Sequence, residues 1–374
     1  MAAKHGEFVM SLLSALKEIT VRVSIRESIF ALIALVAAGI AAAQGGAVVN
    51  PDSLGMSSQR LDRLTSALEA YVEAEELAGS VTLVMRNGAI AYYEALGYRD
   101  RVARDPMQTN TIFRIASQTK AIVSTAAMIL QEEGRVLITD PVADYLPEFA
   151  ETTGAVPRED GGYDVVKANR QVTIRDLLTH TSGFDYGTGI AADLWQEAGI
   201  TGYYFSDRDE PIRETVRRMA ALPASAHPGE AWIYGYNTDI LGAVLEAASG
   251  MPLDELLSDR IFEPLGMNDS HFYLPRSKRN RLATVYGIFE RELLRAPEEG
   301  SAGQGAFVDG PRESFSGGAG LLSTAMDYGR FLQMILNGGT LDGVRILSPK
   351  TVELMGASHL GDVQFAPGVG FGLG

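Results

Sequence analysis

The chain has 374 residues, of which 46% are hydrophobic and 21% charged, and its formal net charge is -15 at pH 7. This is a globular composition with enough apolar residues for a large core, which excludes the disordered and fibrous classes. An acidic surface repels phosphate groups, so nucleic acid is not an expected partner. Cysteine is absent, which excludes disulfides and thiolate metal sites, and the five histidines lack metal-ligand spacing. No cofactor is therefore predicted.

An apolar run near the N-terminus predicts export. Residues 29–43 carry no charge, follow a region with four basic residues and end in three alanines. Small residues at that point are typical of signal-peptidase cleavage, and the run is short for a membrane span. We expect residues 1–43 to be a signal peptide and the protein to be periplasmic or secreted. The alternative is an uncleaved N-terminal anchor; without one, no stable membrane partner is expected.

The first predicted elements are a helix and a hairpin. Ser57 or Ser58 is the type of residue that caps a helix N-terminus. The expected apolar face of this helix comprises Leu61, Leu64, Leu68 and Tyr71. Two runs rich in β-forming residues, 80–86 and 89–97, then flank an Asn-Gly pair, which is a strong hairpin signal.

The middle of the chain, from about residue 116 to 275, has helical periodicity broken by proline and glycine. Thr173 and Asp176 form a capping pair at the start of a short helix. Segments 211–222 and 238–249 have the pattern of amphipathic helices.

The last part returns to mixed character. Short strand-like pieces and glycine-rich turns occupy about 280–323. Thr324 with Asp327 predicts one helix cap, and Ser348 before a proline predicts another. Segment 368–374 has the pattern of a strand that is just beginning.

The candidate nucleophile is Ser117, followed three residues later by Lys120. On a helix these side chains share a face, and the helix N-terminus directs N–H groups toward the serine oxygen. Serine needs a base to take its proton, and lysine is that base only where its neutral form is accessible. The apolar run 121–130 would bury Lys120. The competing interpretation is a helix-capping serine with the lysine extending to solvent, and residues 14–17 show the same spacing.

Residues 113–120 (FRIASQTK) resemble the nucleophile segment of the serine β-lactamase and penicillin-binding-protein superfamily. The similarity is nearest to class C β-lactamases and the related family VIII carboxylesterases. Further segments agree in the same order, at 140–147, 177–183, 228–230, 265–267 and 317–321. The resemblance runs from about residue 55 to the end and implies that Ser117 is the nucleophile and Lys120 its base.

The implied fold is α/β (α+β): an antiparallel sheet flanked by helices, with an inserted, mainly helical domain, as in β-lactamases and transpeptidases. The expected α/β lobe comprises residues 56–115 and 280–374, and the expected helical lobe residues 116–279. The active site would lie between the two lobes. The aromatic residues of 184–205 either line an acyl pocket there or belong to the core.

The family's second motif is Tyr-x-Asn or Tyr-Ser-x. Counting back from the Leu-Gly pair that follows, Tyr234 stands at the catalytic position, where its phenol would relay protons. Gly235 replaces the usual serine and Tyr236 stands at the asparagine position. We expect Tyr236 and Gly318 to bind substrate; in a shifted register Tyr236 would be the catalytic tyrosine.

The family's third motif, Lys/His-Thr-Gly or Trp-Gly-Gly, adds a backbone N–H to the oxyanion hole and is not found. In the family it follows soon after a segment like 368–374. We therefore expect the sequence to stop before the last strands and the final helix.

The expected reaction is acyl transfer through a covalent acyl-enzyme, with a small-molecule ester or amide as substrate. A carboxylesterase acting on short-chain esters is favoured, because the second motif lacks Tyr-x-Asn. The alternatives are a class C-like β-lactamase or D-Ala-D-Ala peptidase, and a catalytically silent, anchored scaffold or binding protein.

Overall fold

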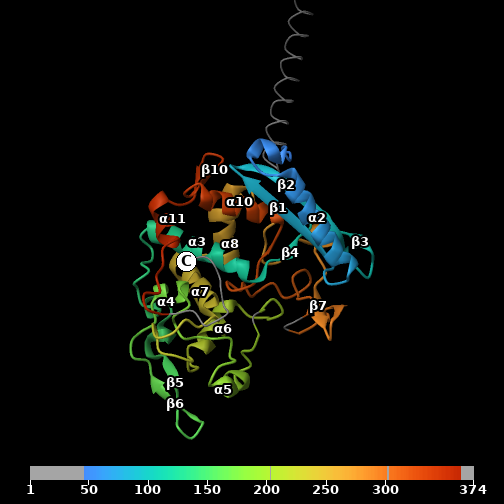
Figure 1. Ribbon diagram of the computed structural model, residues 1–374. Coiled ribbons are helices and arrows are strands. Elements are labelled where there is room, and N and C mark those ends of the chain that lie inside the picture. Colours follow the sequence, from blue (N-terminus) through green and yellow to red (C-terminus); the bar gives the residue numbers. More distant parts are fainter. Residues whose placement is uncertain (1–45, 203, 301–302, 364–374) are drawn as a thin grey trace, which may run out of the picture. The chain divides into compact units, whose positions relative to one another are not determined.

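The computed structural model describes residues 46–202, 204–300 and 303–363 (Figure 1). The predicted leader, 1–43, and the strand predicted at 368–374 lie outside the described residues. Contacts divide the chain after Val48, and every element below belongs to the compact unit that begins at Val49. The fold is mixed α/β as expected, whereas the boundary between the two expected lobes stays a prediction.

The helices vary from single turns to 16 residues. They are α2 Ser58–Glu73, α3 Thr119–Glu132, α4 Ile174–Leu178, α5 Ala192–Glu197, α6 Ile212–Met219, α7 Asn237–Ser249, α8 Leu253–Leu257, α9 Glu263–Leu265, α10 Ala325–Leu336 and α11 Pro349–Met355. Shorter or wider helical turns are η1 Pro51–Leu54, η2 Ala116–Gln118, η3 Val142–Asp144, η4 Pro147–Glu151, η5 Ser258–Phe262 and η6 Arg276–Arg281.

Within the described residues, the strands form one three-stranded sheet, β1-β2-β3, and four two-stranded pairs, all antiparallel. They are β1 Gly79–Arg86, β2 Ala89–Asp100, β3 Asp105–Pro106, β4 Phe113–Arg114, β5 Thr153–Pro157, β6 Tyr163–Lys167, β7 Tyr286–Phe289, β8 Glu292–Arg295, β9 Leu322–Ser323, β10 Thr340–Leu341 and β11 Val344–Arg345.

The predicted hairpin and the helix before it are confirmed. Asn87 and Gly88 have φ of 53° and 77°, as the tight turn between β1 and β2 requires. Ser57 caps α2 by accepting the N–H of Arg60 at 3.3 Å. One detail of the apolar face was wrong: Tyr71 is 52% exposed, and its neighbour Val72 instead lies against the sheet at Gly97.

Helices cover both faces of the hairpin (Figure 1). On the α2 face, Thr65 and Tyr92 share a hydrogen bond of 2.8 Å. On the other face, Leu83 of β1 packs closely against Gly329 of α10. Neighbouring residues of a strand point to opposite faces of the sheet. Tyr92 therefore points toward α2, and Tyr93, the cross-strand partner of Leu83, points toward α10.

The main core lies around α7, which packs against α3, α4, α6 and α8. The side chains of Ile122 and Val123 on α3 and of Leu241 and Val244 on α7 have no exposed surface. Burial of each such side chain contributes about 1.5–3 kcal/mol. This packing fixes α3, and with it the start of that helix, in one position.

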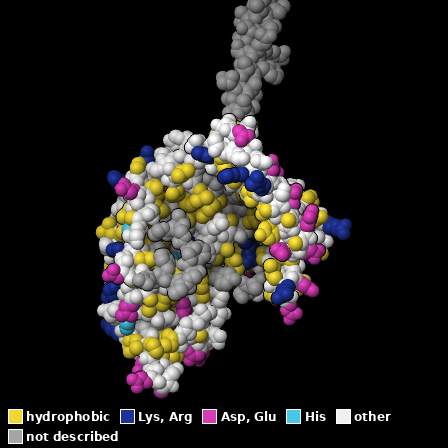
Figure 2. Space-filling model, in the orientation of Figure 1, with side chains coloured by type: hydrophobic (Ala, Val, Ile, Leu, Met, Phe, Trp, Pro, Cys, Tyr) yellow, Lys and Arg dark blue, Asp and Glu magenta, His cyan; other side chains and the backbone are white. Residues whose placement is uncertain are grey.

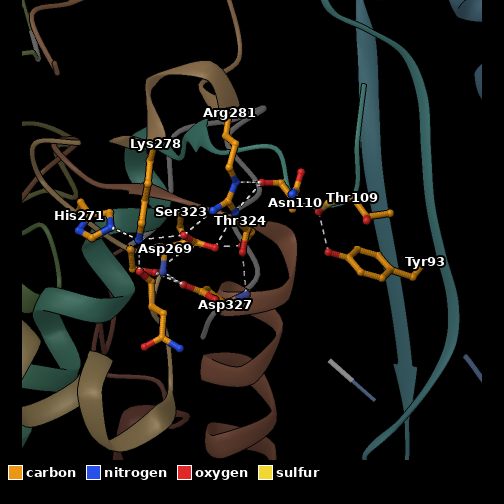
Figure 3. A network of polar contacts seen from close by, with 12 residues as sticks. Tyr93, Thr109, Asn110, Asp269, His271, Lys278, Arg281, Ser323, Thr324 and Asp327 are labelled. Atoms are coloured by element: carbon orange, nitrogen blue, oxygen red, sulfur yellow. Dashed lines mark hydrogen bonds and ion pairs between the residues drawn. The ribbon is translucent and has the colours of Figure 1, made fainter. Parts of the chain in front are cut away.

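A polar network joins the start of α10 to the segment around residue 270 (Figure 3). Thr324 caps α10 through the N–H of Asp327, whose carboxylate accepts the N–H of Asp269 at 2.7 Å. Asp269 in turn accepts bonds from Arg281 and pairs with Lys278 at 3.0 Å. Although burial opposes it, these hydrogen bonds hold the pKa of Asp269 below its usual range. The network anchors the chain beside β9.

In the described residues, neither charge nor apolarity indicates a membrane-spanning helix or a metal site. On the visible face, Asp and Glu side chains are scattered among basic ones (Figure 2). In the parts of the chain that the structure describes, no helix combines the length and apolarity that crossing a bilayer requires. Nor, among those residues, do three His, Asp or Glu side chains gather as ligands of a metal ion.

Candidate active site

A sharp turn from strand to helix presents Ser117. The strand β4 pairs with β9, and η2 and α3 follow directly. Ala116 has a φ of 45°, in the left-handed region that costs a non-glycine residue about 1–3 kcal/mol. The hydroxyl of Thr119 accepts the N–H of Leu321 at 3.1 Å, which holds the start of α3 against the strand region. Ser117 is exposed, whereas Thr119 and Lys120, which begin α3, are buried.

Lys120 is only 9% exposed. Its ammonium donates to Ser117 Oγ at 3.3 Å, to the carbonyl of Gly318 at 2.8 Å and to the hydroxyl of Tyr186 at 3.1 Å. The predicted meeting of the two side chains is thus confirmed. The competing interpretation was wrong, because the lysine is buried and the residue capping α3 is Gln118, which makes no side-chain cap bond.

Tyr234 lies beside the lysine. The Lys120 nitrogen is 4.6 Å from the centre of its ring, close enough for a cation–π contact. Trp232 stacks on the same ring with centroids 5.8 Å apart, and Tyr186 meets it edge-on at 5.7 Å. The structure therefore brings Tyr234 together with Lys120, and its catalytic role stays a prediction.

Tyr186 was not singled out by the sequence analysis, which placed it among aromatics of undecided role. It accepts the Lys120 hydrogen bond, and burial, together with the charge of Asp239 and contact with Tyr234, raises the pKa of its phenol. Its position shortly after the matched segment 177–183 is the only sequence signal that pointed to it. Three other aromatic residues of that stretch, Phe184, Trp195 and Phe205, belong to the core.

Tyr236 does not reach the site. It has no exposed surface, its hydroxyl donates to the carbonyl of Gly202 at 2.6 Å, and its ring stacks on Trp195 at 5.6 Å. Neither substrate binding nor the shifted register agrees with this burial. The chain at Gly235 lies close against Phe184. A Cβ at Gly235 would overlap the carbonyl of Phe184, so the serine usual at this position has no room.

Gly318 contacts Lys120 and Asp239 through its backbone. Its carbonyl accepts the Lys120 ammonium and its N–H donates to Asp239 Oδ1 at 3.1 Å, so both of its backbone polar atoms are used inside the protein. Gly318 thus holds the lysine, and its predicted contact with substrate stays a prediction. Asp239, which the sequence analysis did not select, has no exposed surface and also accepts the hydroxyl of Ser316 at 2.6 Å.

His180 closes the polar side of the site. Its ring lies 4.8 Å from that of Tyr234, and its Nδ1 is 3.0 Å from the side-chain amide of Asn237. Burial, reinforced by the positive charge of Lys120, lowers the pKa of His180 to about 3. The imidazole is therefore neutral at physiological pH and adds no positive charge beside Lys120.

Comparisons with known proteins agree with this geometry. Residues 64–374 match the family model described as Beta-lactamase. An uncharacterised protein of Mycobacterium tuberculosis is 35% identical over 323 residues, covering 84% of this chain and 78% of that protein. Esterase EstB of Burkholderia gladioli is 35% identical over 309 residues, covering 77% and 74%. The structure of EstCE1, a hydrolase with promiscuous acyltransferase activity, is similar with a TM-score of 0.66 and 28% identity, covering 82% and 77%.

Proposed function

The chain belongs to the beta-lactamase family and is a serine hydrolase, and we propose that it is a carboxylesterase with Ser117 as its nucleophile. The observation that carries the proposal is the contrast between an exposed serine and a buried lysine 3.3 Å from its hydroxyl oxygen. The relative EstB is named an esterase, and EstCE1 is named a hydrolase.

Lys120 activates the serine. Its amine lies within hydrogen-bonding reach of Ser117 Oγ, the geometry that proton transfer to a general base needs. Burial disfavours the charged form of an amine, and the N-terminus of α3 favours negative charge on the serine oxygen. Both effects ease transfer of the proton from oxygen to nitrogen.

Acyl transfer then proceeds in two balanced steps. The Ser117 oxygen bonds to the ester carbonyl carbon, and the carbon–oxygen bond to the alcohol breaks. The proton taken up by Lys120 returns to the departing alkoxide through the phenol of Tyr234, whose ring lies beside the ammonium. In the second step a water molecule gives a proton to Lys120 through Tyr234 while its oxygen bonds to the acyl carbon. The bond between that carbon and Ser117 Oγ then breaks, the proton passes to Oγ, and the acid leaves.

Esters are preferred to β-lactams and peptides as substrates because of the second motif. At the position where the motif Tyr-x-Asn offers an amide, this chain has Tyr236, which lies in the core with its hydroxyl bonded to Gly202. An ester also has a better leaving group than an amide.

The test compares hydrolysis of p-nitrophenyl acetate and butyrate with that of nitrocefin, a chromogenic β-lactam. We expect ester turnover with little nitrocefin hydrolysis, and we expect Ser117→Ala to lower ester kcat/KM at least ~10³-fold, since the nucleophile is lost. The matched control is Ser124→Ala, the same change one turn beyond Lys120 on α3.

Ester turnover that survives Ser117→Ala would refute the assigned nucleophile. Faster turnover of nitrocefin than of either ester would instead favour the β-lactamase alternative. A folded protein that is acylated by neither reagent would favour the catalytically silent alternative.

A further inference from the structure

Asp239 is a buried carboxylate that the proposed reaction has not yet used. It lies in α7 and has no exposed surface. Its Oδ1 accepts hydrogen bonds from Ser316 Oγ at 2.6 Å and from the N–H of Gly318 at 3.1 Å, whereas its Oδ2 has no hydrogen-bond partner among the described residues. A buried polar atom without a partner is costly, so it persists where function or a nearby charge compensates.

A single residue, Gly318, separates this carboxylate from Lys120. The carbonyl of Gly318 accepts the ammonium at 2.8 Å, while its N–H points to Asp239. The unpartnered Oδ2 lies in the space that a Cβ at this glycine would need. Carboxylate, glycine and lysine therefore form one continuous arrangement, and no side chain fits between them.

The charge of Asp239 acts on the groups around it. Lys120 faces it from α3, Tyr186 from the loop after α4, and Tyr236 from the turn before α7. Burial raises the pKa of Asp239, while the Ser316 hydroxyl, Lys120 and the Gly318 N–H counteract this rise. Among these neighbours Lys120 is the cation.

We propose that Asp239 is a positioning residue for the hydrolase reaction: it holds residues 316–318 against Lys120, and its negative charge balances the ammonium that forms when the lysine takes the Ser117 proton. The inference rests on the proposed function, in which Lys120 is the base. An opposite charge in a low-dielectric surrounding stabilises the charged form of an amine. Loss of that charge should therefore favour neutral Lys120 and weaken the protonated state that follows attack.

The test is the pH dependence of ester kcat/KM for Asp239→Asn. Asparagine keeps an oxygen for Ser316 and Gly318 but removes the charge. We expect the acid limb of the profile to move to lower pH by about one unit or more, and the plateau to fall about tenfold.

Ser316→Ala is the matched control, because it removes the 2.6 Å hydrogen bond and leaves the charge in place. It should lower the plateau without moving the acid limb. If Asp239→Asn folds poorly, the rate constant for labelling by a fluorophosphonate can be followed against pH instead. This rate constant reports on the folded protein alone, because it does not depend on how much folded protein is present.

An unmoved acid limb in Asp239→Asn, or an equal shift in Ser316→Ala, would overturn the inference. Both results leave the proposed function standing, provided that Ser117→Ala abolishes turnover. Full activity of Ser117→Ala would instead overturn the proposed function itself, so the two failures are distinguishable.

Discussion

At the scale of single residues, burial separates the two tyrosines of the second motif. Tyr234 borders Lys120, whereas Tyr236, two residues later, packs against Trp195 and donates to a carbonyl. The sequence places both phenols beside the same glycine, and only the count back from the Leu-Gly pair favours Tyr234. The turn at Gly235, which presses against Phe184, decides which ring faces the lysine.

Replacement of each tyrosine by phenylalanine should therefore affect a different property: catalysis for Tyr234 and stability for Tyr236. Tyr234→Phe should lower kcat for ester hydrolysis about 10²-fold, the usual contribution of a proton-transferring group, with little change in thermal stability. Tyr236→Phe leaves the carbonyl of Gly202 without its donor and should cost about 1–3 kcal/mol of unfolding free energy, with kcat nearly unchanged. Steady-state kinetics and urea unfolding of both variants measure the contrast, and a reversal of the two patterns would assign catalysis to Tyr236.

Ser117 and Lys120 were predictable because their spacing is local. Tyr186 and Gly318 were not assigned to the lysine, because they contact it from 66 and 198 residues away in the chain. Asp239 went unnoticed for the same reason: nothing adjacent in sequence distinguishes it from a surface acid on a helix. Contacts of this range follow from how α3, α7 and residues 316–318 pack, which a motif does not specify.

At the scale of elements, the caps show what local sequence determines. Thr173 and Asp176 form the predicted capping box at the start of α4, and Arg170 adds two hydrogen bonds to the same carboxylate. The side chain of Asp176 is 7% exposed. Although burial opposes it, the hydrogen bonds from Arg170 and Thr173 lower the pKa of Asp176.

This lowered pKa makes a prediction about stability. A carboxyl group with a lower pKa in the folded state stabilises the fold above its unfolded pKa of about 3.9, and that contribution is lost as the pH falls through the folded pKa. The wild type should exceed Asp176→Asn in unfolding free energy at pH 6, and the gap should shrink as the pH falls below about 4. Urea unfolding at a series of pH values measures it; a gap independent of pH would mean that the charge contributes nothing.

Local pattern was less informative about which side of an element is buried. The predicted apolar face of α2 included Tyr71, yet that ring is exposed and Val72 contacts the sheet instead. The pairing of β4 with β9, across about 200 residues, likewise has no local signal. Both features depend on the partner surface rather than on the segment itself.

At the scale of the whole molecule, the resemblance of ordered segments anticipated the family, and the match over residues 64–374 confirmed it. Composition excluded thiol chemistry and made nucleic acid an unexpected partner, but it could not select a substrate. The natural ester depends on the walls of the site, and these are built by residues from many elements.

The central claim is that Ser117, activated by Lys120, forms the covalent intermediate. The most direct measurement is mass spectrometry of the protein and its peptides after incubation with a fluorophosphonate, which stops at the first covalent step. We predict a single adduct on the peptide that contains Ser117, no adduct in Ser117→Ala, and labelling at least ~10²-fold slower in Lys120→Met. An adduct on another residue, or labelling of Ser117→Ala at the wild-type rate, would contradict the account.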